Sequence, residues 1–314
     1  MVKNMLLEQF RFFYFQNYPE DMETQITYFS IFGGLDWHID TTMSITTLIQ
    51  EHILYNFKEL SQKIAILTLD DYNAKRLLYA LAKGDRRIFS AFNKAGLNNG
   101  NGGATLEFLV EKGLIQLEYS REQHPKEKYP KIKLKKEEAR HRISHKVLFS
   151  HPFLRFWFYF IVPHQNEIQE GKFEHFFQDF TKKQHSYTSL VFEELSELLL
   201  NYHLQDENIK SSGSYWDAKT EIDIFMTTCK NHIYIGECKW SNHKINKKEL
   251  HKLVDKCQKL GITPMQIIFF SKRGFSKELT QLASKKLALY SSDDFQLLVK
   301  SHSTYNTQRF ISLL

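Results

Sequence analysis

Three charged residues interrupt two apolar stretches between positions 212 and 240 (SGSYWDAKTEIDIFMTTCKNHIYIGECKW). Asp223 lies in the first stretch, and Glu237 and Lys239 lie in the second, on either side of Cys238. Both stretches are rich in β-branched and aromatic residues, which predicts two strands joined by a turn. Since residues two apart in a strand share a face, Glu237 and Lys239 project to one side and Cys238 to the other. If the two strands are neighbours, Asp223 brings a third charge to the same place.

Two carboxylates beside an ammonium group suit the metal-assisted hydrolysis of a phosphodiester. That reaction needs a deprotonated water and neutralisation of the negative charge that develops on the phosphate, and a divalent cation held by carboxylates supplies both. Asp223 and Glu237 are the predicted ligands of Mg²⁺ or Mn²⁺, with the backbone carbonyl of Cys238 as a further ligand. Lys239 is predicted to orient the water or to stabilise the transition-state oxygens. The adjacent carboxylates keep its amine charged.

The spacing of these residues is a weak pattern in a chain of which 25% of the residues are charged. Its context favours a site, because the carboxylates interrupt apolar runs (IDIF and IYIGEC), where unpaired charge is costly. The alternative is an edge strand with a solvated polar face. Other chemistries fit less well. His141 and His145 lack the glutamate of an HExxH zinc site, and no serine or cysteine lies in a nucleophile elbow.

Composition indicates a globular cytoplasmic protein. With 314 residues and 42% hydrophobic content, the chain is long enough for two domains. Its three cysteines form no CxxC pair, which suits a reducing compartment. The first residues lack the pattern of a secretory signal, and the longest apolar run, Phe153–Pro163, is too short for a bilayer and contains Arg155. We expect no membrane association.

Positive charge is concentrated in one segment. The net charge is +6, and the residues from Arg121 to Lys146 include ten Lys or Arg against four Glu. Such a cluster suits contact with a polyanion such as DNA, and it equally suits a solvated hairpin and helix surface. The predicted nucleic-acid contacts are Arg86, Arg87, Lys131, Lys133, Lys135, Lys136, Arg140 and Arg142.

The first half of the chain has the element order of a winged helix. Residues before 40 predict a helix, a break at Pro19 and a helix that ends at Gly33, and a helical period resumes at Met43. A winged helix then requires helices, a glycine-rich turn (LNNGNGG), a last helix and a strand pair. Glu107 and Glu111 disfavour insertion of that last helix into a DNA groove. The predicted segments are helices 70–83, 86–96 and 104–112 and strands 115–119 and 129–134.

The second half predicts a mixed sheet flanked by helices. The aromatic run 143–171 precedes it and is interpreted as a buried seam between domains, because large rings bury much surface at small entropic cost. Stacking of nucleobases on Phe156 or Trp157 is the less favoured reading. The predicted elements are helix 187–203, strands 209–211, 221–227 and 232–239, helix 247–260, strand 265–271, helix 277–286 and strand 287–290.

This order resembles the αβββαβ core of the PD-(D/E)XK, or restriction-endonuclease-like, nuclease superfamily. More narrowly, PFLRFWFYFIVP, VFEEL, SYWDAKTEIDIF and IGECKW resemble the C-terminal region of an archaeal and bacterial family of AAA-type ATPases, a region of unknown function. The resemblance implies that Glu193 is the helix acid that joins the metal ligands. Glu194 is the competitor for that role, and Glu221 is a neighbour of Asp223.

The resemblance extends toward the N-terminus, where ITYFSIFGGLDW is similar to the end of that family's ATPase lid. The chain contains no GxxxxGK[ST] motif, and GNGGAT lacks the lysine, so we do not expect ATP hydrolysis. The expected organisation is a lid-like helical segment (1–40), a mainly α winged-helix domain (41–150), an aromatic helical connector (151–185) and an α/β nuclease-like domain (186–314).

The expected function is Mg²⁺-dependent DNA cleavage by an endonuclease whose winged helix positions the DNA. The alternative is a non-catalytic DNA-binding or regulatory protein that works with a separate ATPase partner. DNA sequence, strandedness and oligomeric state are left open by the sequence.

Overall fold

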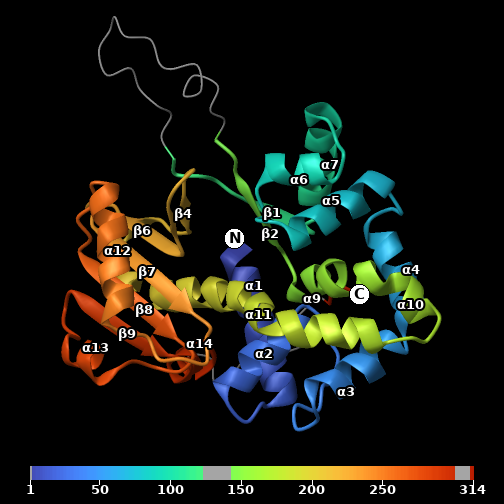
Figure 1. Cartoon of the computed structure of the whole chain (residues 1–314), viewed down its shortest axis with the longest axis horizontal. Helices are drawn as coiled ribbons and strands as arrows, with labels where there is room; N and C mark the ends of the chain where they lie inside the picture. Colours follow the sequence, from blue (N-terminus) through green and yellow to red (C-terminus); the bar gives the residue numbers. More distant parts are fainter. Residues whose placement is uncertain (1, 123–142, 301–311) are drawn as a thin grey trace, which may run out of the picture.

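A computed structural model describes residues 2–122, 143–300 and 312–314. It is a mixed α/β structure, with a mainly helical N-terminal region and a mixed sheet in the C-terminal region (Figure 1). The first region contains α1 (Val2–Asn17), α2 (Met22–Phe32), α3 (Ile45–Ile49), the π-helix η1 (Gln50–Leu54), α4 (Phe57–Leu67), α5 (Tyr72–Lys83), α6 (Ile88–Lys94), α7 (Asn99–Glu111), β1 (Ile115–Glu118) and β2 (Lys146–Phe149).

Helices then lead into the sheet. The connecting elements are α9 (Pro152–Phe156), η2 (Trp157–Ile161), η3 (Val162–His164), α10 (Gln165–Gln169) and the long helix α11 (Glu174–His203). The remaining elements are η4 (Gln205–Glu207), β3 (Ile209–Ser211), β4 (Tyr215–Trp216), β5 (Glu221–Ile222), β6 (Ile224–Thr228), β7 (Ile233–Lys239), α12 (Lys247–Lys259), β8 (Gln266–Ser271), α13 (Lys277–Gln281), β9 (Leu287–Ser291), η5 (Ser292–Phe295) and α14 (Gln296–Lys300).

The ends of the N-terminal helices follow the local signals. Asp71 accepts a hydrogen bond from the backbone N–H of Ala74 at the start of α5, and Gly33 and Gly84 are the C-caps of α2 and α5, as predicted. The predicted turn LNNGNGG is wrong. Asn98 accepts the N–H of Asn101 and so caps α7 at Asn99, which makes this glycine-rich segment the first turns of the helix.

The strand pair after α7 differs from the expected one. β1 is antiparallel to β2, with Ile115 opposite Phe149, whereas the sequence placed 146–149 in the aromatic seam. The predicted strand 129–134 lies outside the described residues. The winged-helix prediction rests on three helices followed by a strand pair. The described elements α5, α6 and α7, followed by β1 and β2, have this order.

The C-terminal sheet has the strand order β3-β6-β7-β8-β9. β6 is antiparallel to both of its neighbours, β3 and β7. β8 is parallel to β7, and β9 is parallel to β8. One face, which includes Met226 and Cys238, packs toward α11, and the other, which includes Ile235 and Phe269, packs toward α12 (Figure 1). Residues 237 and 239 therefore lie on the α12 face.

The first of these two cores joins the N-terminal helices, the aromatic segment, α11 and the sheet. Phe10, Phe156 and Met226 belong to the same buried cluster, although more than two hundred residues separate the first from the last. Trp157 stacks on Phe57 with ring centroids 5.8 Å apart, which confirms a core role for the aromatic run. α11 continues through position 185, the expected end of the connector. No helix in the described part of the chain is both long and apolar enough to cross a bilayer.

Two neighbouring glycines of α7 provide a matched test of this packing. A Cβ on Gly102 would lie 2.7 Å from the ring of Phe92, whereas a Cβ on Gly103 would meet no atom within 4 Å. We expect Gly102→Ala to lower the free energy of unfolding by about 1–3 kcal/mol through overpacking. Gly103→Ala should raise it by roughly 0.5–1 kcal/mol through helix propensity. Urea unfolding measures both, and equal effects would contradict the α6–α7 contact.

Candidate active site

Asp223 lies at a break in the predicted strand 221–227. β5 ends at Ile222 and pairs with β4, whereas β6 begins at Ile224 opposite Gly236 of β7. Within the described residues, the pairing of β6 with β7 ends at Gly236, so no β6 residue is paired with the last three residues of β7. The carboxylate of Asp223 takes that place, because its Oδ2 accepts the N–H of Cys238 at 2.8 Å. This bond holds the first carboxylate against the Glu-Cys-Lys segment.

Glu237 is buried, with 7% of its surface exposed. Its Oε1 accepts from Lys239 Nζ at 2.6 Å, and its Oε2 accepts from Lys256 Nζ of α12 at 2.8 Å. Burial opposes ionisation, but the charges of the two lysines and their hydrogen bonds outweigh it and lower the pKa of Glu237. The carboxylate is therefore ionised at neutral pH.

Lys256 is absent from the sequence prediction. It stands 17 residues after Lys239, on a helix with several other lysines, and no local pattern distinguishes it from them. The only hint in the sequence is that Lys256 lies three residues after Leu253, on the side of α12 that is buried. This hint points to Glu237 only once the packing of α12 on the sheet is known.

The other two predicted acids hold protons more tightly than usual. Burial raises the pKa of Glu193 to about 7, against the charges of Arg86 and Lys146, which lower it. Burial also raises the pKa of Asp223 well above its ordinary range, and the charges of Glu193 and Glu237 raise it further. The charges of neighbouring carboxylates therefore help to keep Asp223 and Glu193 partly protonated at neutral pH, whereas Glu237 is ionised.

The structure distinguishes Glu193 from its neighbour Glu194. Glu193 exerts the largest effect of any neighbouring charge on Asp223. Glu194 instead acts on Arg155 and Tyr187 and lines a cavity with residues of α1 and β2. Of these two neighbours, Glu193 is the one whose charge raises the pKa of Asp223.

Glu221 does not contact Asp223 through a hydrogen bond in the described part of the chain. It is exposed and forms an ion pair with the buried ammonium group of Lys146, which also lies 4.6 Å from the centroid of the Trp216 ring. Its charge still raises the pKa of Glu193. Glu221 is therefore an outer member of the acidic cluster.

Oxygen atoms of Asp223, Glu237 and Cys238 are the candidate ligands of a hard cation, which would have to compete with the lysines bound to Glu237. In a strand, successive carbonyls point to opposite edges. Lys239 O accepts from Lys272 N at 3.1 Å on the β8 side, so Cys238 O points to the side of Asp223. Within the described residues no three His, Cys, Asp or Glu side chains are grouped to hold a metal ion. Two carboxylates and one carbonyl are a sufficient protein contribution for Mg²⁺.

The thiol of Cys238 takes no part in this arrangement. Cys238 is buried in the core shared with α11, and burial raises the pKa of its thiol well above the ordinary value. This confirms the prediction that its side chain packs on the opposite side from Glu237 and Lys239.

Arg86 and Arg87, two of the residues predicted to contact DNA, interact with other groups of the protein. Arg87 Nη2 donates to Asp217 O at 3.2 Å, at the turn between β4 and β5. Arg86 acts electrostatically on Glu118 and Glu193. Both therefore lie toward the β4–β5 hairpin. The other predicted contacts, Lys131, Lys133, Lys135, Lys136, Arg140 and Arg142, lie outside the described residues.

Residues 157–253 match the family DUF234, described as archaea bacterial proteins of unknown function. The matched segment includes Glu193, Asp223, Glu237 and Lys239 and stops three residues before Lys256. No curated protein matches the chain. A solved structure, that of protein VC1899 from Vibrio cholerae, aligns with 16% identity and a TM-score of 0.30. The alignment covers 80% of this chain and 56% of that one.

Neutralising Glu193 should stabilise the metal-free protein at high pH. The folded state binds its proton with a pKa of about 7 against an ordinary value of 4.5, so the free energy of unfolding falls as the pH rises from about 4.5 to 7. Glu193→Gln removes this penalty. We expect it to raise the free energy of unfolding at pH 8 by on the order of 2 kcal/mol and to leave it nearly unchanged at pH 5.

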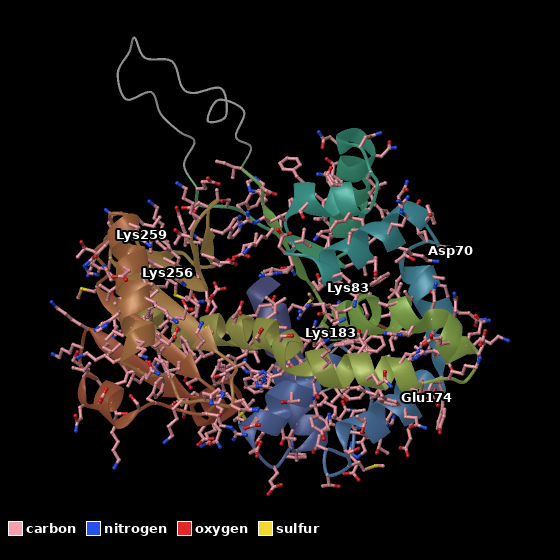
Figure 2. The ribbon with its side chains drawn as sticks, in the orientation of Figure 1. Asp70, Lys83, Glu174, Lys183, Lys256 and Lys259 are labelled. Atoms are coloured by element: carbon pink, nitrogen blue, oxygen red, sulfur yellow. The ribbon has the colours of Figure 1, made fainter. Side chains whose placement is uncertain are left out.

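Urea unfolding in EDTA at the two pH values measures this difference. Glu174→Gln, at the exposed start of the same helix (Figure 2), is the control and should show no such pH-dependent gain. A gain for Glu193→Gln that is the same at both pH values would contradict the raised pKa.

Proposed function

We propose that the chain is a Mg²⁺- or Mn²⁺-dependent DNA endonuclease with Asp223, Glu237 and Lys239 at its active site. The observation that carries the proposal is the arrangement at the open end of β7. There the buried carboxylate of Glu237 is paired with Lys239, and the carboxylate of Asp223 accepts a hydrogen bond from the N–H of Cys238, the residue between them. Buried ionisable groups with mutually shifted pKa values are typical of catalytic sites.

The order of elements also supports this proposal. Between α11 and α12 lie three strands of the main sheet, β3, β6 and β7, and the separate β4–β5 hairpin, which is inserted between β3 and β6. Each of the three strands is antiparallel to its neighbour, and β8, which follows α12, is parallel to β7. With the β4–β5 hairpin set aside, this order resembles the αβββαβ order of the restriction-endonuclease-like core, and that resemblance supports the proposal. By motif, the metal acids and the lysine of that core correspond to Glu193, Asp223, Glu237 and Lys239. The family match to proteins of unknown function leaves the activity open.

The residues have separate roles in the proposed reaction. Asp223, Glu237 and the Cys238 carbonyl would hold the cation, with Glu193 beside them, and the bound cation would lower the pKa of a water and neutralise phosphate charge. Burial disfavours the charge of Lys239, but Glu237 and Asp223 overcome it and raise the pKa of its ammonium group. Lys239 therefore remains a donor for a phosphate oxygen. Asp223 and Glu193 must lose protons to bind a cation, which favours activity above neutral pH.

The N-terminal region is the proposed DNA-positioning module. In this proposal α5, α6, α7 and the β1–β2 pair form the winged helix. Most of the basic segment that is predicted as the wing lies outside the described residues. Arg86 and Arg87 lie next to the hairpin that leads to Asp223, so DNA that contacts them lies near the site. No part of the chain carries a phosphate-binding P-loop motif.

A second candidate function is DNA binding or regulation without cleavage, in partnership with a separate ATPase. The specific observation in its favour is that both oxygens of Glu237 are already engaged by lysines. An acid that is fully paired within the protein can serve structure alone.

Plasmid cleavage tests the proposal directly. With Mg²⁺ or Mn²⁺, the wild-type protein should nick or linearise supercoiled plasmid. Asp223→Asn and Lys239→Met should each reduce the rate by roughly 10²-fold or more, because each removes a group that acts on the transition state. Asp255→Asn, an exposed acid on α12, is the control and should cleave normally.

Equal behaviour of the wild type and both site variants would refute hydrolysis at this site. Metal-independent, salt-sensitive DNA binding without cleavage would favour the second function.

A further inference from the structure

We propose that Lys256 is a substrate-binding residue of this site, which pairs with Glu237 in the free protein and turns to the DNA phosphate when a divalent cation occupies Glu237. This inference rests on the proposed phosphodiester chemistry. It adds a residue that neither the Glu-x-Lys spacing nor the family match includes.

The geometry gives Lys256 and Lys239 equivalent starting positions. Their ammonium groups bind opposite oxygens of the same carboxylate, at 2.8 Å and 2.6 Å. The Glu237 side chain is 9% exposed, whereas the Lys256 and Lys239 side chains are 31% and 35% exposed. Both amines therefore connect a buried anion with the solvent from which a substrate would arrive.

The two lysines reach Glu237 from different elements. A cation on Glu237 would place a further positive charge beside both amines and weaken both ion pairs. Lys239 is two residues from Glu237 on the same strand and on the same face of the sheet. Lys256 extends from a neighbouring helix on a stem of four methylene groups, so its amine can leave the carboxylate and approach a phosphate oxygen.

A basic stripe on α12 leads to this amine. Lys248, Lys252, Lys256 and Lys259 lie within one flank of the helix, since their spacings of four, four and three residues place them on one side. Lys256 and Lys259 are labelled on α12 in Figure 2. Glu249 pairs with Lys252, and Asp255 is the other acid near the stripe. Lys256 is the member of the stripe that contacts the candidate site, so a DNA backbone that follows the stripe would reach Glu237.

If the role of Lys256 were purely structural, its replacement would affect cation and DNA binding differently. If Lys256 only neutralised Glu237, its loss would leave a buried carboxylate with one partner and would weaken folding, cation binding and DNA binding together. If it exchanges between Glu237 and phosphate, its loss removes a competitor of the cation and a partner of the DNA. The two affinities then change in opposite directions.

Two binding measurements on the full chain separate these cases. Isothermal titration with Mn²⁺ in the absence of DNA should show that Lys256→Met binds the ion more tightly than the wild type. Fluorescence anisotropy with a labelled duplex in Ca²⁺ should show about tenfold weaker DNA binding and a salt dependence reduced by about one phosphate contact. Lys256→Arg should restore DNA binding. Lys252→Met, on the same stripe but away from Glu237, should not change Mn²⁺ affinity.

The outcomes distinguish this inference from the proposed cleavage. A parallel loss of Mn²⁺ and DNA affinity in Lys256→Met would overturn the exchange, and so would unchanged DNA affinity. If Lys256→Met binds Mn²⁺ more tightly and DNA more weakly than the wild type, but the wild type does not cleave plasmid, the exchange is supported and hydrolysis is refuted. A wild type that binds neither Mn²⁺ nor duplex would refute both.

Discussion

Glu237 carries a negative charge inside a β-sheet, and such a charge is tolerated only where cations and donors surround it. Lys239 supplies one partner from the same strand and Lys256 supplies the other from α12. The carboxylate thereby ties the end of β7 to the helix that covers it. It also keeps two ammonium groups beside a half-buried acidic cluster. Folding and the proposed chemistry depend on the same three side chains.

The position of the second carboxylate depends on the N-terminal region. Asp223 follows the β4–β5 hairpin, and residues before and after the basic segment hold that hairpin. Glu118 accepts hydrogen bonds from the N–H and hydroxyl groups of Ser214, and Trp216 Nε1 donates to Ser144 O at 2.9 Å. Arg87 holds the turn that follows. The site is therefore assembled between the two regions, although all of its predicted acids come from the second.

The charges of that N-terminal region also reach the acids. Arg86 and Lys146 lower the pKa of Glu193, in opposition to its burial. Any rearrangement that moved these cations away would shift the Glu193 pKa upward and so favour its protonated form.

Local patterns in the sequence determined most elements and one part of the site. Caps such as Asp71 and Gly84, and the two-residue period of β7, depend on neighbours within a few positions. They correctly placed Glu237 and Lys239 on one face and Cys238 in the core. Tertiary structure decided the break at Asp223, the effect of Glu193 rather than Glu194 on the pKa of Asp223, the pairing of β1 with β2 and the contact of Lys256 with Glu237. Each of these depends on how segments that are distant in the sequence pack together. Burial and charge pairing at such contacts produce no local sequence pattern from which they could be predicted.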